Sequence, residues 1–321
     1  MKRFSVAHPL IVIGAVVIAL LPFQMSGYHT GLGAHVAIFF IAILGLNILT
    51  GYTGQISIGH GAFMAIGGYT TAVMSHYHHT NLILTLPMAF AIAFGFGVLV
   101  GIPALRFSGV YLALATFALA VSVPQFTLKF SSFLGGSNGL QTSTTKTNAW
   151  IYGVSWSCAA ILYLVAWLVL RGRTGRAFRA IRDSEVAAAA SGVTLPIYKT
   201  LAFGISAAFA GVAGSLFVIA TNGFAQPNEF AVFLSLELLI GAAVAGLGSL
   251  WGILVGAVFV ALLPTVSADV PLIGSAHGQD VVFGLIVIVI MLLLPTGFAG
   301  LLHRLRTLPG IGTAVEKQAG G

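Results

Sequence analysis

A segment near the middle of the chain, residues 171–199, holds its densest group of charged side chains. The segment reads RGRTGRAFRAIRDSEVAAAASGVTLPIYK and lies between two long apolar runs. Six of the fourteen Lys and Arg residues lie in it: Arg171, Arg173, Arg176, Arg179, Arg182 and Lys199. Cationic side chains beside an apolar run either face anionic lipid headgroups and fix the orientation of the chain, or dock a partner. Both interpretations stay open on the charges alone.

The local pattern predicts that this segment contains a helix from about residue 175 to 191. Thr174 is a suitable N-cap, Gly192 a suitable end, and Pro196 follows shortly after. One face of this helix collects Phe178, Ile181, Glu185 and Ala188, and the rest of its surface carries Arg176, Arg179, Arg182 and Asp183. Such an amphipathic helix, with a half made of small residues, is suited to a groove in another protein.

Glu237 is the one acidic residue placed well inside an apolar run. A charge at the centre of a membrane helix costs roughly 2.5 to 3.5 kcal/mol on insertion scales, so it seldom faces lipid. Its carboxylate has three candidate roles: pairing with a neighbouring helix, capping a broken backbone, or contacting the ammonium group of a substrate. A structural hydrogen bond is the expected role, with the substrate contact as the alternative.

Four polar residues gather in a stretch interrupted by glycines: Asn47, Gln55, Ser57 and His60. An unwound backbone inside a membrane is tolerated where it lines a cavity, as in transporters with discontinuous helices. These four residues, with Glu237, are therefore the candidates for lining a translocation path. His60 lies between glycines and is expected to be a packed, hydrogen-bonded residue and not a metal ligand.

Enzymatic alternatives have little support. Residues 135–139, GGSNG, match the G-x-S-x-G pattern of serine hydrolases, but the polar loop that follows Ser137 lacks the helix that this motif requires. The group His76, His78 and His79 is too tightly spaced in a loop to predict a metal site. None of the five lysines follows a glycine, so the chain has no phosphate-binding G-x-x-x-x-G-K-[ST] loop. Work driven by ATP must be done by another subunit.

Composition explains what positions these residues. The chain has 321 residues, of which 58% are hydrophobic and 7% charged, with a mean hydropathy of +1.02. This leaves too little polar surface for a water-soluble globule. Runs such as FGLIVIVIMLLLP are apolar at every position, which favours helices over the alternating segments of a barrel. The single cysteine, Cys158, excludes an intramolecular disulfide. We expect an all-α, polytopic membrane helix bundle.

About ten transmembrane or re-entrant segments are expected. The apolar runs lie at 9–27, 33–50, 58–77, 82–103, 109–128, 150–170, 200–221, 230–247, 249–267 and 280–298. With both termini cytoplasmic, twelve Lys and Arg residues fall inside and only Lys129 and Lys146 outside, as the positive-inside rule requires. We expect one transmembrane domain over 1–307 and a flexible cytoplasmic tail over 308–321. The run 58–77 has a glycine-rich, polar beginning that predicts a broken or re-entrant helix.

Glycine seams predict close helix packing. Gly248, Gly252 and Gly256 recur every four residues in the ninth run, and Gly97 and Gly101 do so in the fourth. Small residues at this spacing let two helix backbones approach closely. Packing within the chain is the expected use.

Six stretches together resemble a known family. They are NILTGYTGQISIGHGAFMAIGGY at 47–69, RFSGVYLALATFA at 106–118, GGSNGL at 135–140, AIRDSEVAAAASGV at 180–193, GLGSLWGILVGA at 246–257 and LPTGFAGL at 294–301. In this order they are similar to the M-type permease subunit of branched-chain amino acid ABC importers, over most of residues 45–301. The chain departs from the family pattern at Ala245, where a glycine is expected, and at Thr296, where a basic residue is common.

The resemblance implies a function and a set of partners. EVAAAASG is similar to the loop by which importer permeases dock onto their ATPases, with Glu185 as its acid and Gly192 as its glycine. It implies a second, homologous permease subunit, two ABC ATPases that use ATP and Mg, and a periplasmic binding protein, in a bacterial inner membrane with no nucleic acid partner. Importers of urea or short amides share much of the pattern, so they stay an alternative. A channel or secondary transporter without an ATPase is the alternative of another class.

Overall fold

Long apolar runs give this chain its helices, because a backbone in lipid must form its hydrogen bonds internally. The computed structural model describes residues 27–107, 109–143 and 146–268, together with 284, 288, 297, 298 and 300. Within these residues six helical segments are long and apolar enough to cross a membrane: Gly27–Tyr52, Leu82–Ala104, Val110–Lys129, Asn148–Arg171, Leu195–Ala220 and Pro227–Ala245. A shorter apolar helix covers Ile253–Pro264. The described part is an all-α, polytopic membrane protein.

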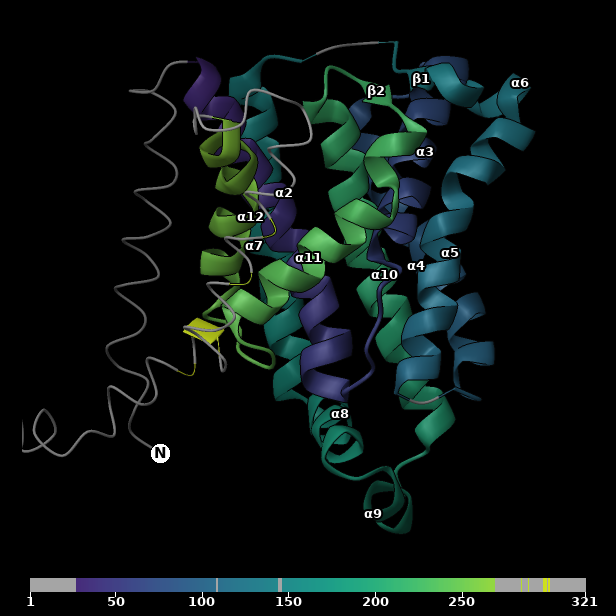
Figure 1. Cartoon of the computed structure of the whole chain (residues 1–321), viewed down its shortest axis with the longest axis vertical. Helices are drawn as coiled ribbons and strands as arrows, with labels where there is room; N and C mark the ends of the chain where they lie inside the picture. Colours follow the sequence, from purple (N-terminus) through teal and green to yellow (C-terminus); the bar gives the residue numbers. More distant parts are fainter. Residues whose placement is uncertain are drawn as a thin grey trace, which may run out of the picture.

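The first half of the chain runs up and down the bundle (Figure 1). Helix α2 (Gly27–Leu46) continues into a π-helical turn, η2 (Asn47–Tyr52), and then leaves the helix. The chain then turns back as an extended segment without regular secondary structure before α3 begins. The elements that follow are α3 (His60–His78), α4 (Leu82–Ala104), α5 (Val110–Lys129), α6 (Ser131–Leu134), η3 (Gly136–Asn138) and β1 (Leu140–Gln141).

The second half adds a projection at one end of the bundle and a second interrupted helix pair. Its elements are α7 (Asn148–Arg171), α8 (Arg173–Asp183), α9 (Glu185–Ala190), α10 (Leu195–Ala220), β2 (Phe224–Ala225), η4 (Pro227–Phe230), α11 (Val232–Ala245) and α12 (Ile253–Ala268). Helices α8 and α9 extend beyond the lower end of the bundle in Figure 1, and α6 and the strands lie at the upper end. The two short strands pair antiparallel, with Leu140 opposite Ala225.

Helix α10 is the centre of the packing. In its most apolar window 89% of residues are buried, against 28% in each of α4, α5 and α7. It contacts α3 and α4 through glycines: a Cβ on Gly67 or on Gly214 would overlap a carbonyl of the facing helix, Gly211 O or Met64 O. A Cβ on Gly97 would lie 2.5 Å from the Cβ of Ala207 and 2.8 Å from Phe203 O. Gly97 therefore packs within the chain, as its sequence spacing predicts.

Most of the predicted runs contain a helix, with corrections at their ends. Residues 28–32, expected to connect two spans, are helical and belong to α2. The run 58–77 is a helix from His60 with a non-helical lead-in, as expected for a broken helix. The eighth and ninth runs begin as helices only at Val232 and Ile253. The run 9–27 apart from its last residue, the run 280–298 apart from 284, 288, 297 and 298, the tail 308–321 and both termini lie outside the described residues.

Candidate functional site

The projection formed by α8 and α9 is two helices and not one. The single helix predicted over 175–191, with Thr174 as its cap, is wrong: α8 begins at Arg173, after Gly172 in an extended conformation. Ser184 then adopts an extended backbone, and its hydroxyl accepts a hydrogen bond of 3.3 Å from the amide of Ala187, which caps α9. The expected end at Gly192 is confirmed, because this residue has a φ of +84° and follows the last turn.

The apolar stripe of the projection packs against its own bundle. Phe178, Ile181 and Ala188 are each at most 2% exposed. Glu185, expected on the same face, instead forms an ion pair with Lys199 of α10, with 2.6 Å between Oε2 and Nζ. The surface open to a partner is therefore the other side of α9, which is small and apolar: Val186, Ala187, Ala189 and Ala190 are all exposed.

Two of the arginines expected to face a partner turn onto the chain itself. Nη1 of Arg179 donates to Leu170 O at 3.3 Å. Arg182 donates from Nε and Nη2 to Asp183 Oδ1, each at 3.2 Å, and from Nη1 to Gly51 O at 3.2 Å. Arg173 and Arg176 are exposed, and Arg171 lies over the ring of Trp167 at 4.5 Å. Some of the arginines of the projection therefore form contacts within the chain and are not free to face a partner.

The predicted break between residues 53 and 59 is present, and its polar residues bond to one another and to the surrounding helices. Thr50 Oγ1 donates to Gln55 O at 3.1 Å and Gln55 Nε2 donates to Thr53 Oγ1 at 3.1 Å. The amide of Ile58 donates to Thr116 Oγ1 of α5 at 3.0 Å, and the amide of Gly59 to Ser57 Oγ at 3.3 Å. The break is a fixed, hydrogen-bonded structure.

His60 begins α3 as a packed, hydrogen-bonded residue. It is fully buried, and its Nε2 lies 2.9 Å from Ser206 Oγ, which itself donates to Gly45 O at 2.7 Å. The amide of the next residue, Gly61, donates to Ser235 Oγ of α11 at 2.8 Å. No group of three His, Cys, Asp or Glu residues in the described ranges is placed to hold a metal ion.

A second break, residues 246–252, joins α11 to α12 and lies against the first. Asn47 Oδ1 accepts from the amide of Gly248 at 2.8 Å, and its Nδ2 donates to Ser249 O at 2.9 Å. The expectation that Gly248, Gly252 and Gly256 share one face of a helix is wrong, because α12 begins only at Ile253 and Gly248 has a φ of +82°. Gly252 and Gly256 still allow close packing within the chain, against Ala245 O and Gly241 O.

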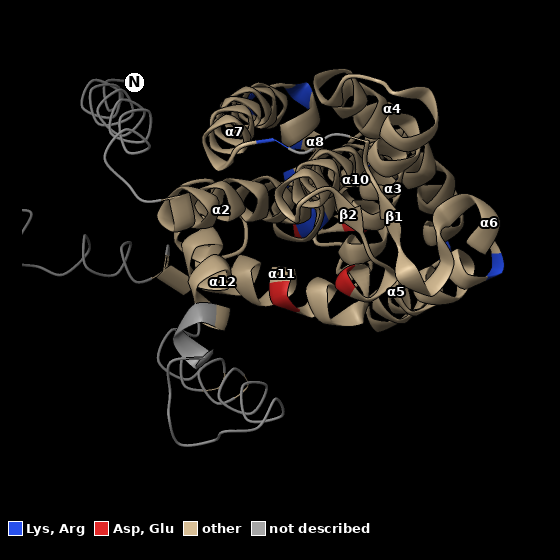
Figure 2. Cartoon of the chain, turned by 90° about the horizontal axis from the view of Figure 1, so that it is seen from above, with Lys and Arg blue, Asp and Glu red and all other residues tan. Residues whose placement is uncertain are grey.

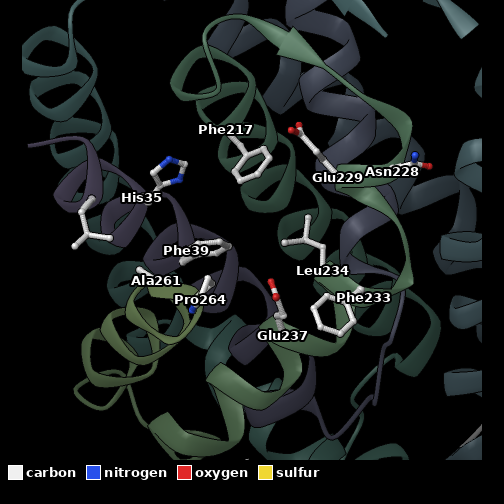
Figure 3. Close-up of a pocket in the computed structure, with 11 residues that line it drawn as sticks. His35, Phe39, Phe217, Asn228, Glu229, Phe233, Leu234, Glu237, Ala261 and Pro264 are labelled. Atoms are coloured by element: carbon white, nitrogen blue, oxygen red, sulfur yellow. The ribbon is translucent and has the colours of Figure 1, made fainter. Parts of the chain in front are cut away.

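Glu237 lies apart from the first break, in a cavity of about 440 Å³ (Figure 3). The cavity is lined by residues of α2, α10, η4, α11 and α12: Leu32, His35, Phe39, Phe217, Asn228, Glu229, Phe233, Leu234, Glu237, Ala261 and Pro264. Glu229 Oε2 is buried, and among the described residues neither it nor the Glu237 carboxylate has a hydrogen-bond partner. Figure 2 marks an acidic position on α11, with α12 next to this helix in that view.

This arrangement suits a ligand that carries an ammonium group and an apolar part. Two carboxylates without partners attract an ammonium group, and the rings of Phe39, Phe217 and Phe233 offer an apolar wall. Sequence reasoning found Glu237 but missed His35 and Glu229, which reach the cavity from other elements. The only signal for them was a charged or titratable residue beside an apolar run.

The hydrolase motif has the wrong setting. Ser137 lies in the 3-10 turn η3, which follows the short helix α6 and precedes β1. A nucleophile elbow needs the reverse order, a strand followed by a helix. Nearby, His76 Nδ1 lies 2.9 Å from Gln141 O, so this histidine holds the strand β1 next to the end of α3.

Comparisons with known proteins agree on one family. Residues 30–292 match the family described as the permease component of the branched-chain amino acid transport system. The chain is 32% identical, over 80% of its length and 68% of the relative's, to the high-affinity branched-chain amino acid transport system permease protein LivM of Salmonella typhimurium. It is 24% identical to LivH of the same organism, over 82% of this chain and 91% of that one. It is 30% identical to the autoinducer 2 import system permease protein LsrC of Klebsiella pneumoniae, over 44% of this chain and 41% of that one. No solved structure matches.

Proposed function

The chain belongs to the permease family of branched-chain amino acid transport systems, and from this premise we propose that it carries branched-chain amino acids through the membrane as one subunit of an ATP-binding-cassette importer. A periplasmic binding protein delivers the amino acid, and separate ATPase subunits use ATP and Mg. The chain itself is a permease and not an enzyme, and it binds no cofactor in this proposal.

The observation that carries the proposal is the projection of α8 and α9 beyond the bundle (Figure 1). Its exposed side is a patch of small residues with Val186 at its centre, 82% exposed. A patch of this kind fits a groove in an ATPase subunit, and the neighbouring Asp183 supplies charge at its rim. Of the predicted coupling residues, Glu185, Ala188 and Arg179 serve to hold the projection on the bundle. Gly192 ends it.

The ion pair between Glu185 and Lys199 gives the projection a mechanical link. Lys199 is 9% exposed at its side chain and lies in the first turns of α10, the central helix. When a partner displaces α9, the ion pair makes α10 move with it as a rigid body. This ion pair is one route by which nucleotide-driven closing of the ATPases moves the bundle.

The family and the distribution of charge support a proposal for the partners and the orientation. Because the chain is similar to both LivM and LivH, we propose a second, homologous permease beside it, with two ATPases below the pair. The arginine-rich end is then cytoplasmic, and the end with Lys129 and Lys146 faces the periplasm of a bacterial inner membrane. We also propose that both termini are cytoplasmic and that the chain crosses ten times, which is the number of apolar runs in the sequence with 9–27 and 280–298 included.

The cavity around Glu237 is our proposed section of the translocation path. A free carboxylate recognises the ammonium group of an amino acid, which urea and neutral amides lack, so the cavity favours the amino acid over those substrates. Among the other predicted path residues, Asn47, Ser57 and His60 lie in contacts that hold the break, and Gln55 lies within it. We therefore propose that the translocation path passes through the cavity and that the residues of the break hold the surrounding helices in place.

Co-purification tests the proposal directly. The tagged chain is expressed with its candidate second permease and ATPases, and the complex is assayed for composition, ATP hydrolysis and leucine uptake. We expect Val186→Arg to lose the ATPases and uptake while the permease stays inserted. The matched control is Phe107→Arg, an exposed apolar residue of the α4–α5 connection, which keeps both. A wild-type chain that takes up leucine without any ATPase would refute the importer and favour a channel or secondary transporter.

A further inference from the structure

Arg182 reaches out of the coupling projection into the place where the two helix breaks meet. Its Nη1 donates to the carbonyl of Gly51, in the last turn before the first break. Its aliphatic stem covers Gly54, where a Cβ would lie 3.2 Å from Arg182 Cγ and 3.5 Å from its Cα. Gly54 has a φ of +72°, which favours glycine, so both the backbone turn and the close approach of α8 depend on this residue.

The same guanidinium lies beside the second break. A Cβ on Gly248 would be 3.1 Å from Arg182 Nη1 and 3.2 Å from Gly51 O. Asn47 closes the junction with its two hydrogen bonds to Gly248 N and Ser249 O. Nη1 of Arg182 thus lies beside both breaks, although its side chain stays 40% exposed.

The chemistry suits an arginine. Carbonyls in the last turn of a helix lack intrahelical donors and carry the negative end of the helix dipole, which a cation stabilises. The planar guanidinium has donors to spare, and the remaining ones hold Asp183 in the next position of the chain. A lysine has one compact charge and cannot serve Gly51 and Asp183 with the same fixed geometry.

Both breaks lead to α11, the helix that carries Glu237. Directly after the first break, the amide of Gly61 in the first turn of α3 is bonded to Ser235 near the start of α11. The second break begins at Gly246, directly after the last residue of α11. A shift of α8 that moves the junction is therefore felt at both ends of the helix that carries Phe233, Leu234 and Glu237 of the cavity.

We propose that Arg182 is a positioning residue that transmits the movement of the ATPase-bound projection to α11 through the junction of Gly51, Asn47 and Gly248. This inference rests on the proposed importer function and adds the route from the ATPase to the cavity. Arg182 then acts between subunits only indirectly. Its role differs from that of Val186, which makes the contact with the partner.

The test separates transmission from docking. Arg182→Ala and the control Arg173→Ala, an exposed residue at the start of the same helix, are purified with the ATPases and assayed for ATP hydrolysis and leucine uptake. We expect Arg182→Ala to recover the ATPases and hydrolyse ATP like the wild type, while uptake falls about tenfold, as for loss of a hydrogen bond to a charged group. Arg182→Lys restores part of the uptake, and Arg173→Ala keeps all of it.

A second readout reports the junction itself. In a Cys158→Ser background, Ile56→Cys places a thiol at a position of the first break that is 41% exposed. Maleimide labelling of this thiol is compared with and without ATP and vanadate. We expect the rate to respond to nucleotide in the wild-type and Arg173→Ala proteins, to stay constant in Arg182→Ala, and to respond more weakly than wild type in Arg182→Lys. The lysine variant gives this readout if the alanine variant is not recovered.

Three outcomes overturn the inference. Equal loss of ATPase and uptake in Arg182→Ala would make Arg182 a docking contact. Normal uptake, or labelling that still follows nucleotide, would make it an ordinary helix cap. If the wild-type chain recovers no ATPase and shows no ATP-dependent uptake, the proposed importer function itself has failed, and the inference falls with it.

Discussion

The two sides of α10 are built in different ways. Toward α3 and α4 it packs through glycines, with Gly67 against Gly211 and Gly214 against Met64, so that backbones touch. Toward α2, which it also approaches closely at Gly45, it borders the cavity that holds Glu229 and Glu237, and Asn47, directly after α2, is bonded to the second helix break. Close backbone packing makes the first side a rigid body, whereas the carboxylates lie on the side that we propose binds the amino acid.

The projection is attached to both sides. The ion pair from Glu185 to Lys199 holds α9 to the packed side, and the hydrogen bond from Arg182 to Gly51 holds α8 to the broken side. In the proposed importer, a projection that moves at one attachment and stays fixed at the other changes the angle between the helices on the two sides of α10. The different packing of the two sides is then part of the mechanism, and each side can be tested by its own variants.

The largest effect is expected on the packed side. Gly97→Leu places a side chain against Ala207 Cβ and Phe203 O of α10, at distances that a Cβ does not tolerate. Overpacking of this kind costs about 3 kcal/mol, and folded protein should be lost. Thermal unfolding in detergent, followed by size-exclusion fluorescence, measures the loss. The control is Gly95→Leu, two residues away on the same helix, where a Cβ meets nothing within 4 Å.

Equal stability of the two leucine variants would contradict the packed side as a rigid body. Loss of uptake in Gly97→Leu without loss of stability would contradict it too, because it would place transport on the wrong side of α10.

The next effect is expected in the cavity. Glu237→Gln keeps the shape of the side chain but removes the charge that holds an ammonium group. Uptake of leucine should fall about tenfold or more, since a hydrogen bond to a charged group contributes about 1.5 to 3 kcal/mol. Stability should stay unchanged, because no described residue bonds to the carboxylate. Proteoliposome uptake by the full complex, with Leu236→Ala as the neighbouring control, provides the measurement.

Normal uptake by Glu237→Gln would remove the cavity from the path. A large loss of stability instead would support the structural role first expected for Glu237, and would mean that the two sides of α10 are equally fixed.

Sequence patterns predicted which segments of this molecule are helical better than they predicted where its side chains point. Continuous apolar runs predict helices because lipid leaves no other backbone structure, and glycines around Gln55 predict the break. The split at Ser184 was missed because the apolar spacing of Phe178, Ile181 and Ala188 continues across it, although Ser184 before Glu185 is a capping signal.

Contacts between distant parts of the chain explain what the sequence could not predict. Arg182 lies 131 positions from Gly51, and Asn47 lies 201 from Gly248. The cavity brings together His35, Glu229 and Glu237 from separate elements. From its sequence neighbours alone, each of these residues looks like a common surface arginine, polar residue of a span, or acidic residue of a loop. Their roles at the junction and in the cavity become visible only when α2, α8 and α11 are packed together.

The smallest effect is expected where the projection joins the packed side. Glu185→Lys removes the partner of Lys199 and places a second cation next to it, so α9 is held less firmly on α10. Because Glu185 is 46% exposed, solvent screens much of this repulsion, and uptake should fall only a few-fold. The charge swap Glu185→Lys with Lys199→Glu should recover it, since the pair is restored with opposite polarity. If the swap fails to restore uptake and Glu185→Lys alone loses the ATPases, Glu185 is a contact to the ATPase subunit. Arg182 would then be the residue that connects the projection to the bundle.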